Sequence, residues 1–84
     1  MDSHIWFHVS LTLDDDIIIH RLLACGFFKK DEMFCDAQDR RVRIVQDKRC
    51  LEIGIPHTDV LDEQEQLEFI LARLLLDDAA VARI

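Results

Sequence analysis

The longest regular stretch of the chain alternates apolar and polar side chains over residues 4–13. Successive side chains of a β-strand point to opposite faces of a sheet, so this pattern predicts a strand with one face on the core. The side chains expected on the core face are Ile5, Phe7, Val9, Leu11 and Leu13. The opposite face is expected to carry His4, Trp6, His8, Ser10 and Thr12.

Residues 17–25 predict a helix, because their apolar side chains recur at the spacing of one helix face. The acids at 14–16 suit a helix N-terminus, where they can cap the backbone and complement the dipole. Gly26 is expected to end the helix in a left-handed conformation, with Phe27 as the apolar contact beyond it. The positions that define the apolar face are Ile18, Leu22 and Cys25, with Ile19 and Leu23 beside them.

The middle of the chain predicts a short strand followed by a β-hairpin, because two alternating runs flank a short polar turn. Gly54, inside the second run, indicates a bulge or a close packing contact. The expected segments are a solvated connection at 29–32, a short strand at 33–35, a turn at 37–40, a strand at 41–46, a turn at 47–48 and a strand at 49–55.

A second helix is expected to begin at Thr58-Asp59 or at Asp62, after Pro56 ends the strand, and to run at least through Leu76. Asp77 and Asp78 interrupt its apolar pattern. Residues 79–84 are expected either to prolong the helix or to end in a loose turn.

These elements predict a small α+β protein in which residues 1–84 form a single domain with the order β-α-β-β-β-α. One mainly antiparallel sheet with two helices packed on one face is the expected architecture, of the ferredoxin-like or split-βαβ kind. Many unrelated functions share this architecture, so the fold alone names none of them.

The net charge of −7 and the pI near 4.8 disfavour direct binding to nucleic acid or to an anionic membrane surface. Such a charge suits a protein that docks on a basic surface, and equally one that is merely soluble. Three cysteines without a CxxC motif indicate reduced thiols. With no apolar run long enough to span a membrane and no basic start typical of a signal peptide, the expected location is cytoplasmic.

The sequence predicts no enzyme, no cofactor and no metal site. The chain has only two glycines, so no glycine-rich phosphate loop is present. His4 and His8 lie four residues apart on a strand, about 13 Å, which is too far for one metal ion. A thiol site is conceivable from His57 and Asp59 with Cys50 or Cys35, but no motif supports it.

The second helix has more apolar residues than one core-facing stripe needs. We expect Phe69, Leu76 and also Ala80 to point away from the core, where they would contact a second copy or a partner. The alternative is a helix wedged deep in the core. Trp6 poses a similar question: it is an interface anchor flanked by His4 and His8, or a cover over the edge of the core.

Charge is unevenly distributed along the chain, with five basic residues at 40–49 and seven acids after residue 57. The basic hairpin, with Arg41 and Arg43, predicts contact with an acidic partner or a phosphate, or else an ordinary solvated edge. The acids of the second helix, among them Glu65, are expected either to imitate a phosphate backbone or to form an ordinary solvated helix face.

The function expected from these features is that of a small acidic protein-interaction module: an inhibitor, adaptor or accessory subunit that occupies a surface of a protein partner. Nucleic-acid-handling machinery is one expected partner class, since small acidic inhibitors encoded by phages are similar in size and charge. A homodimer is also expected. The alternative is a dimeric regulatory domain that responds to a ligand or metal. The predicted interface residues are Trp6, His4, His8, Phe69, Leu76, Arg41, Arg43 and Glu65.

Overall fold

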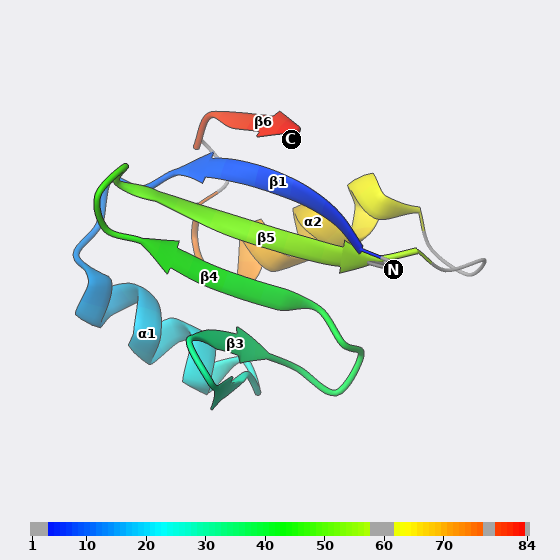
Figure 1. Cartoon of the computed structure of the whole chain (residues 1–84), viewed down its shortest axis with the longest axis horizontal. Coiled ribbons are helices and arrows are strands. Elements are labelled where there is room, and N and C mark those ends of the chain that lie inside the picture. The colour runs from blue at the N-terminus through cyan, green and yellow to red at the C-terminus, as the bar shows by residue number, and fades with distance from the viewer. Residues whose placement is uncertain (1–3, 58–61, 77–78, 84) are drawn as a thin grey trace.

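A computed structural model describes residues 4–57, 62–76 and 79–83 (Figure 1). Over these residues the chain forms six strands and two helices. The elements are β1 (His4–Ser10), α1 (Asp15–Ala24), β2 (Phe28–Lys30), β3 (Met33–Cys35), β4 (Arg41–Val45), β5 (Cys50–Pro56), α2 (Glu63–Arg73) and β6 (Val81–Arg83). No helix in the described segments is long and apolar enough to cross a membrane.

The six strands form one sheet in the order β2-β3-β4-β5-β1-β6, and every neighbouring pair is antiparallel. Because β1 and β4 both pair with β5, they run parallel to each other on either side of it. The part β4-β5-β1-β6, with α1 and α2 in the connections, therefore has the ferredoxin-like order. The hairpin β2-β3 extends that sheet at one edge, and the expected α+β architecture with both helices on one face is confirmed.

The core lies between the helices and one face of the sheet, where the predicted alternation holds. Phe7 and Val9 of β1 are buried, as are the inward residues of β5. The register of β1 and β5 places these buried residues side by side, since Val9 pairs with Leu51 and Phe7 with Ile53. The fully buried side chains of this cluster include Ile18, Leu22, Val42, Leu51, Ile53, Ile55, Leu67, Ile70 and Leu74.

Both helices end in the same hydrogen-bonded motif, in which a left-handed residue follows the last turn. After α1 that residue is Gly26, with φ of 95°, and Phe27 behind it is buried, as the sequence predicts. After α2 it is Leu75, with φ of 58°. A left-handed conformation costs a side-chain-bearing residue about 1–2 kcal/mol, so glycine is the usual choice.

This ending of α2 corrects two expectations. The helix ends at Arg73 and does not run through Leu76. The left-handed turn then points Leu76 back into the core, with 4% of its surface exposed, whereas Leu75 is 68% exposed. Leu76 Nα donates to the Leu71 carbonyl oxygen at 2.8 Å, which closes the turn.

Two strands were not expected. Residues 28–30 form β2, although the sequence predicts a solvated connection at 29–32, and 81–83 form β6 in place of a prolonged helix or loose turn. Asp62 caps α2, since its carboxylate accepts a hydrogen bond from Glu65 Nα at 2.7 Å. The other proposed helix start, Thr58-Asp59, and the interruption at Asp77 and Asp78 lie outside the described residues.

Candidate functional site

The helices cover one face of the sheet and leave the other uncovered (Figure 1). We call this uncovered side the helix-free face. Pairing of the strands sets its side chains in cross-strand rows. One row consists of Phe28, Cys35, Arg41, Gly54 and Trp6. Next to it lie the pairs Lys30 with Met33, Arg43 with Glu52 and Glu52 with His8.

Trp6 lies flat over Gly54 in the centre of this face. A Cβ atom built on Gly54 would stand 2.8 Å from the Trp6 ring, closer than real side chains approach. Glycine is therefore required here for the indole to rest on the strand, which confirms that Gly54 marks a close packing contact. The ring is half-buried in this position.

Glu52 is the centre of an ionic cluster beside Trp6. Its carboxylate accepts hydrogen bonds from His8 Nε2 at 3.0 Å and from Arg43 Nε at 2.8 Å. The hydrogen bond from His8 and the nearby Arg43 guanidinium hold the pKa of Glu52 below its ordinary value of 4.5. The carboxylate is thus ionised throughout the neutral range and neutralises part of the positive charge of Arg43.

The depressed pKa of Glu52 predicts a stability loss on acidification. A group with a lowered folded-state pKa stabilises the protein above its unfolded pKa, and this contribution is lost as the pH falls through the folded value. We expect Glu52→Gln to reduce the free energy of unfolding by about 0.5–1 kcal/mol at neutral pH, because half-exposed partners are screened by water. Urea unfolding of both proteins down to about pH 3 should show the difference begin to shrink below the ordinary pKa of 4.5 and continue to fall through the lower folded-state pKa. A constant difference across that range would contradict this account.

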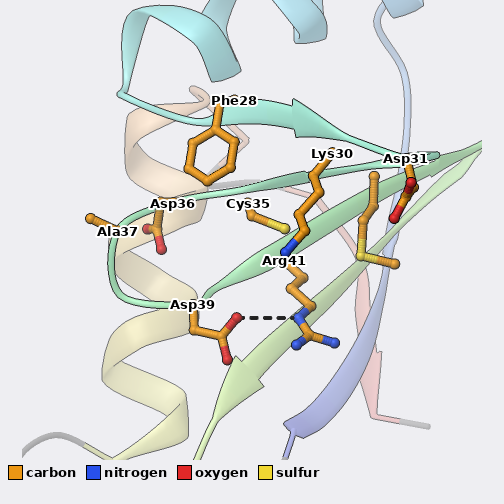
Figure 2. A pocket seen from close by; sticks show the side chains of 9 residues that line it. Phe28, Lys30, Asp31, Cys35, Asp36, Ala37, Asp39 and Arg41 are labelled. Carbon is orange, nitrogen blue, oxygen red and sulfur yellow. Dashed lines mark hydrogen bonds and ion pairs between the residues drawn. The ribbon is translucent and has the colours of Figure 1, made fainter.

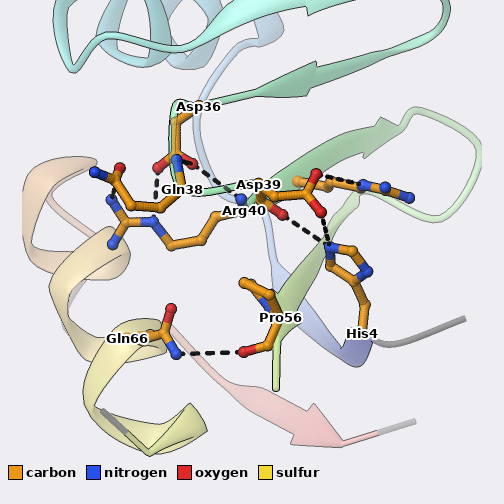
Figure 3. Close-up of polar contacts among 8 residues, drawn as sticks. His4, Asp36, Gln38, Asp39, Arg40, Pro56 and Gln66 are labelled. Carbon is orange, nitrogen blue, oxygen red and sulfur yellow. Dashed lines mark hydrogen bonds and ion pairs between the residues drawn. The ribbon is translucent and has the colours of Figure 1, made fainter. Parts of the chain in front are cut away.

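The loop between β3 and β4 is held by Asp36 (Figure 3). Asp36 is 8% exposed, and its carboxylate accepts hydrogen bonds from Gln38 Nα at 3.0 Å and Arg40 Nα at 2.9 Å. Its other oxygen pairs with Arg40 Nε at 2.6 Å. On the far side of the loop, His4 Nε2 donates to the Asp39 carbonyl oxygen at 2.8 Å, which ties β1 to the loop.

A hollow of about 570 Å³ opens between β2 and this loop (Figure 2). Its floor is formed by Met33 and Cys35, and the ring of Phe28, 51% exposed, forms one wall. Its charged lining has both signs, with Lys30 and Arg41 as the bases and Asp31, Asp36 and Asp39 as the acids. Arg41 lies 3.4 Å from the exposed carboxylate of Asp39, whereas Lys30 has no ion-pair partner among residues 4–57, 62–76 and 79–83.

A second, smaller hollow lies nearer the centre of the sheet. It measures about 260 Å³ and is lined by Trp6, Met33, Arg43 and Glu52. Met33 lines both hollows, so they lie next to each other between the β2 edge and Trp6. An apolar floor with charged walls is the usual composition of a recognition surface.

The structure gathers four of the eight predicted interface residues on the helix-free face: Trp6, His8, Arg41 and Arg43. His4 belongs to the same side of β1, but its side chain is only 2% exposed and holds the loop instead. The prediction that Leu76 is a surface residue is wrong, because its side chain is buried in the core. Glu65 and Phe69 are exposed on α2, in the helix layer.

Phe69 points away from the core as expected and is 48% exposed. Two guanidinium groups lie against its ring: Arg40 Cζ is 5.2 Å and Arg73 Cζ 4.8 Å from the centroid. Such cation–π contacts contribute about 0.5–1 kcal/mol each at exposed sites. Through Arg40, Phe69 also connects α2 to the Asp36 loop.

Residues Phe28, Lys30 and Met33 were not among the predicted interface residues. They lie in the β2-β3 hairpin, where the sequence shows only a polar stretch and a three-residue apolar run. The signal that could have found them is the order Phe28-Lys29-Lys30, which places an aromatic ring and an amine on the same face of an extended strand.

No three His, Cys, Asp or Glu side chains in the described segments gather as metal ligands. The Cys50 version of the conceivable thiol site is not assembled, since Cys50 and His57 lie at opposite ends of β5, about 20 Å apart. His57 Nδ1 is instead 2.6 Å from Glu63 Oε1. Asp59, the third residue of the conceivable thiol site, lies outside the described residues.

Comparison of the chain with protein-family models, with curated proteins and with solved structures finds no match in any of the three. The geometry of the helix-free face is therefore the basis on which a function can be proposed.

Proposed function

We propose that this protein is an interaction module that occupies a surface of another protein with its helix-free face, as an inhibitor, adaptor or accessory subunit does. The observation that carries the proposal is the pair of adjacent hollows between Phe28 and Trp6, whose lining combines apolar side chains with charged side chains of both signs. Aromatic and arginine side chains are the residues that most often dominate binding energy at protein interfaces. A cytoplasmic location, which the three free thiols favour, is part of this proposal.

The charges on this face are of both signs, so the partner surface that fits it is apolar at its centre and has charges of both signs around that centre. Arg43 pairs with Glu52, and Lys30 and Arg41 share the larger hollow with three aspartates. A net charge of −7 opposes the approach of a nucleic acid, whose charge extends well beyond one contact site. A protein patch has only a few charges, so short-range complementarity decides its binding.

Two matched pairs of residues allow a sharp test. Phe28 and Phe69 are 51% and 48% exposed and lie on opposite faces. Lys30 and Lys48 are both exposed and have no ion-pair partner in the described part of the chain. The face variant is Phe28→Ser with Lys30→Glu, and the control is Phe69→Ser with Lys48→Glu. Both tagged proteins, checked for folding by circular dichroism, serve as baits in nuclease-treated lysate.

We expect the wild-type protein and the control to retain one stoichiometric protein, and the face variant to lose it. Higher salt should release that protein, because the contacts include exposed charges. Loss with the control alone would move the interface to the helix layer. Capture that occurs in a parallel untreated lysate but not in the nuclease-treated one would replace the protein partner with a nucleic acid. If none of the baits retains a protein, the proposal is wrong.

A further inference from the structure

The two edges of the sheet differ in chemistry. The β2 edge consists of Phe28–Lys30, and its two lysines are adjacent. The β6 edge consists of Val81–Arg83, in which a valine and an alanine precede a single arginine. Charged side chains, lysines above all, protect edge strands against pairing with other strands, so β2 with its two lysines is better protected than β6 with one arginine.

The backbone of β6 has hydrogen-bonding groups on its outer side. Ser10 Nα donates to the Ala80 carbonyl oxygen at 2.9 Å, which makes this a hydrogen-bonded pair of the β1-β6 ladder. Such pairs alternate along antiparallel strands, so Ala82, opposite His8, also turns its backbone groups toward β1. The backbone groups of Val81 and Arg83 consequently point outward, away from the sheet.

We propose that two copies of this chain pair through β6, antiparallel about a two-fold axis at Ala82. Val81 of each copy would then stand opposite Arg83 of the other, and their outward groups would form four hydrogen bonds across the axis. Ala82 would face Ala82 of the second copy. This interface is separate from the partner surface of the proposed function and does not depend on it.

The side chains favour a second copy at this edge. In the symmetric pair no like charges stand directly opposite each other, and the small Ala82 side chains meet at the axis. The same pairing at β2 would set Lys29 against Lys29, which destabilises a sheet. Val81 is 41% exposed and lines a hollow of about 390 Å³ together with Phe7, Glu63, Gln64 and Arg83. Val81 of the second copy, opposite Arg83, would cover part of that hollow.

A dimer of this kind joins two six-stranded sheets into one continuous sheet. Both helix-free faces then lie on the same side, next to each other, and β2 of each copy remains at an outer edge. Two adjacent copies of the same surface would suit a partner with a repeated or symmetric surface, since linked sites bind with higher avidity.

Sedimentation and light scattering over a wide range of concentration test the proposal. We expect the wild-type mass to rise from 9.9 kDa toward twice that value. Ala82→Lys sets two ammonium groups together at the axis, and Val81→Pro removes an outward donor but no bond to β1. Each should weaken dimerisation roughly tenfold or more. Ala72→Lys, the same change at an exposed position of α2, should have no effect.

Amide hydrogen exchange provides a second readout on the unaltered chain. The amides of Val81 and Arg83 should be protected at high concentration and should lose protection on dilution, whereas the amide of Lys29 should not change. A wild-type mass of one copy at every concentration would overturn the proposal, as would a dimer that persists in both β6 variants. Capture of a protein partner by the Ala82→Lys variant would keep the proposed function intact in either case.

Discussion

Leu76→Asp is expected to unfold the domain, whereas Leu75→Asp, one residue earlier, is expected to leave it folded. Leu76 is 4% exposed and lies in the core cluster, so its replacement would bury a carboxylate without a partner. That penalty is several kcal/mol, which is comparable to the whole stability of a small domain. Leu75 is 68% exposed, so the same substitution there costs little desolvation.

The two variants are matched in chemistry and differ only in side-chain direction. Thermal and urea unfolding followed by circular dichroism measures both. A Leu76→Asp protein that melts close to the wild type would mean that the left-handed turn at Leu75 is not formed. Any experiment that uses position 76 as a surface probe would, by the same reasoning, measure unfolding and not binding.

Asp36→Ala is expected to cost about 3 kcal/mol of stability. The substitution breaks a buried ion pair with Arg40 and leaves two backbone amides of the loop without their acceptor. Arg40 would also lose the contact that positions its guanidinium over Phe69. Urea unfolding gives the free energy, and Asp36→Asn should lie between the wild type and the alanine variant, because one acceptor oxygen remains.

Asp47→Ala, at an exposed position of the turn between β4 and β5, is the control. It should change the free energy of unfolding by less than about 0.5 kcal/mol. Equal effects of Asp36→Ala and Asp47→Ala would show that the loop is not held by the buried carboxylate.

Local patterns predicted the elements whose side chains pack against the core on one face. The alternation from Ile5 to Val9 predicted β1 and which of its side chains face the core. The run around Ile53 predicted β5 in the same way. The first helix, with Ile18 and Leu22 buried, follows the same rule. In each case burial of one face imposes a periodicity that is visible without knowledge of the partner element.

The elements that the sequence did not predict are those without such a periodicity. Strands β2 and β6 are edge strands with every residue exposed, so no alternation between core and solvent marks them. The alanines before and within β6 are favourable in helices, and only pairing with β1 overrides that preference. Leu75 adopts a left-handed conformation usually reserved for glycine, so the end of α2 had no signal.

The candidate site was predicted residue by residue but not as a surface. Trp6, His8, Arg41 and Arg43 were each identified from their own segment. Their common location on one face follows from strand order and register, which bring β4 and β1 to either side of β5. Single-segment patterns contain no information about that order, and for this reason Phe69 and Glu65 were grouped with residues from which the sheet separates them.

Because Trp6 packs on Gly54, binding at the helix-free face can be followed by tryptophan fluorescence. The chain has one tryptophan and no tyrosine, so its intrinsic fluorescence arises almost entirely from an indole at the centre of the proposed contact surface. A bound macromolecule would remove water from that ring and shift its emission to shorter wavelength, while events confined to the helix layer would leave the spectrum unchanged. The protein thus contains its own label at the position where contact is proposed.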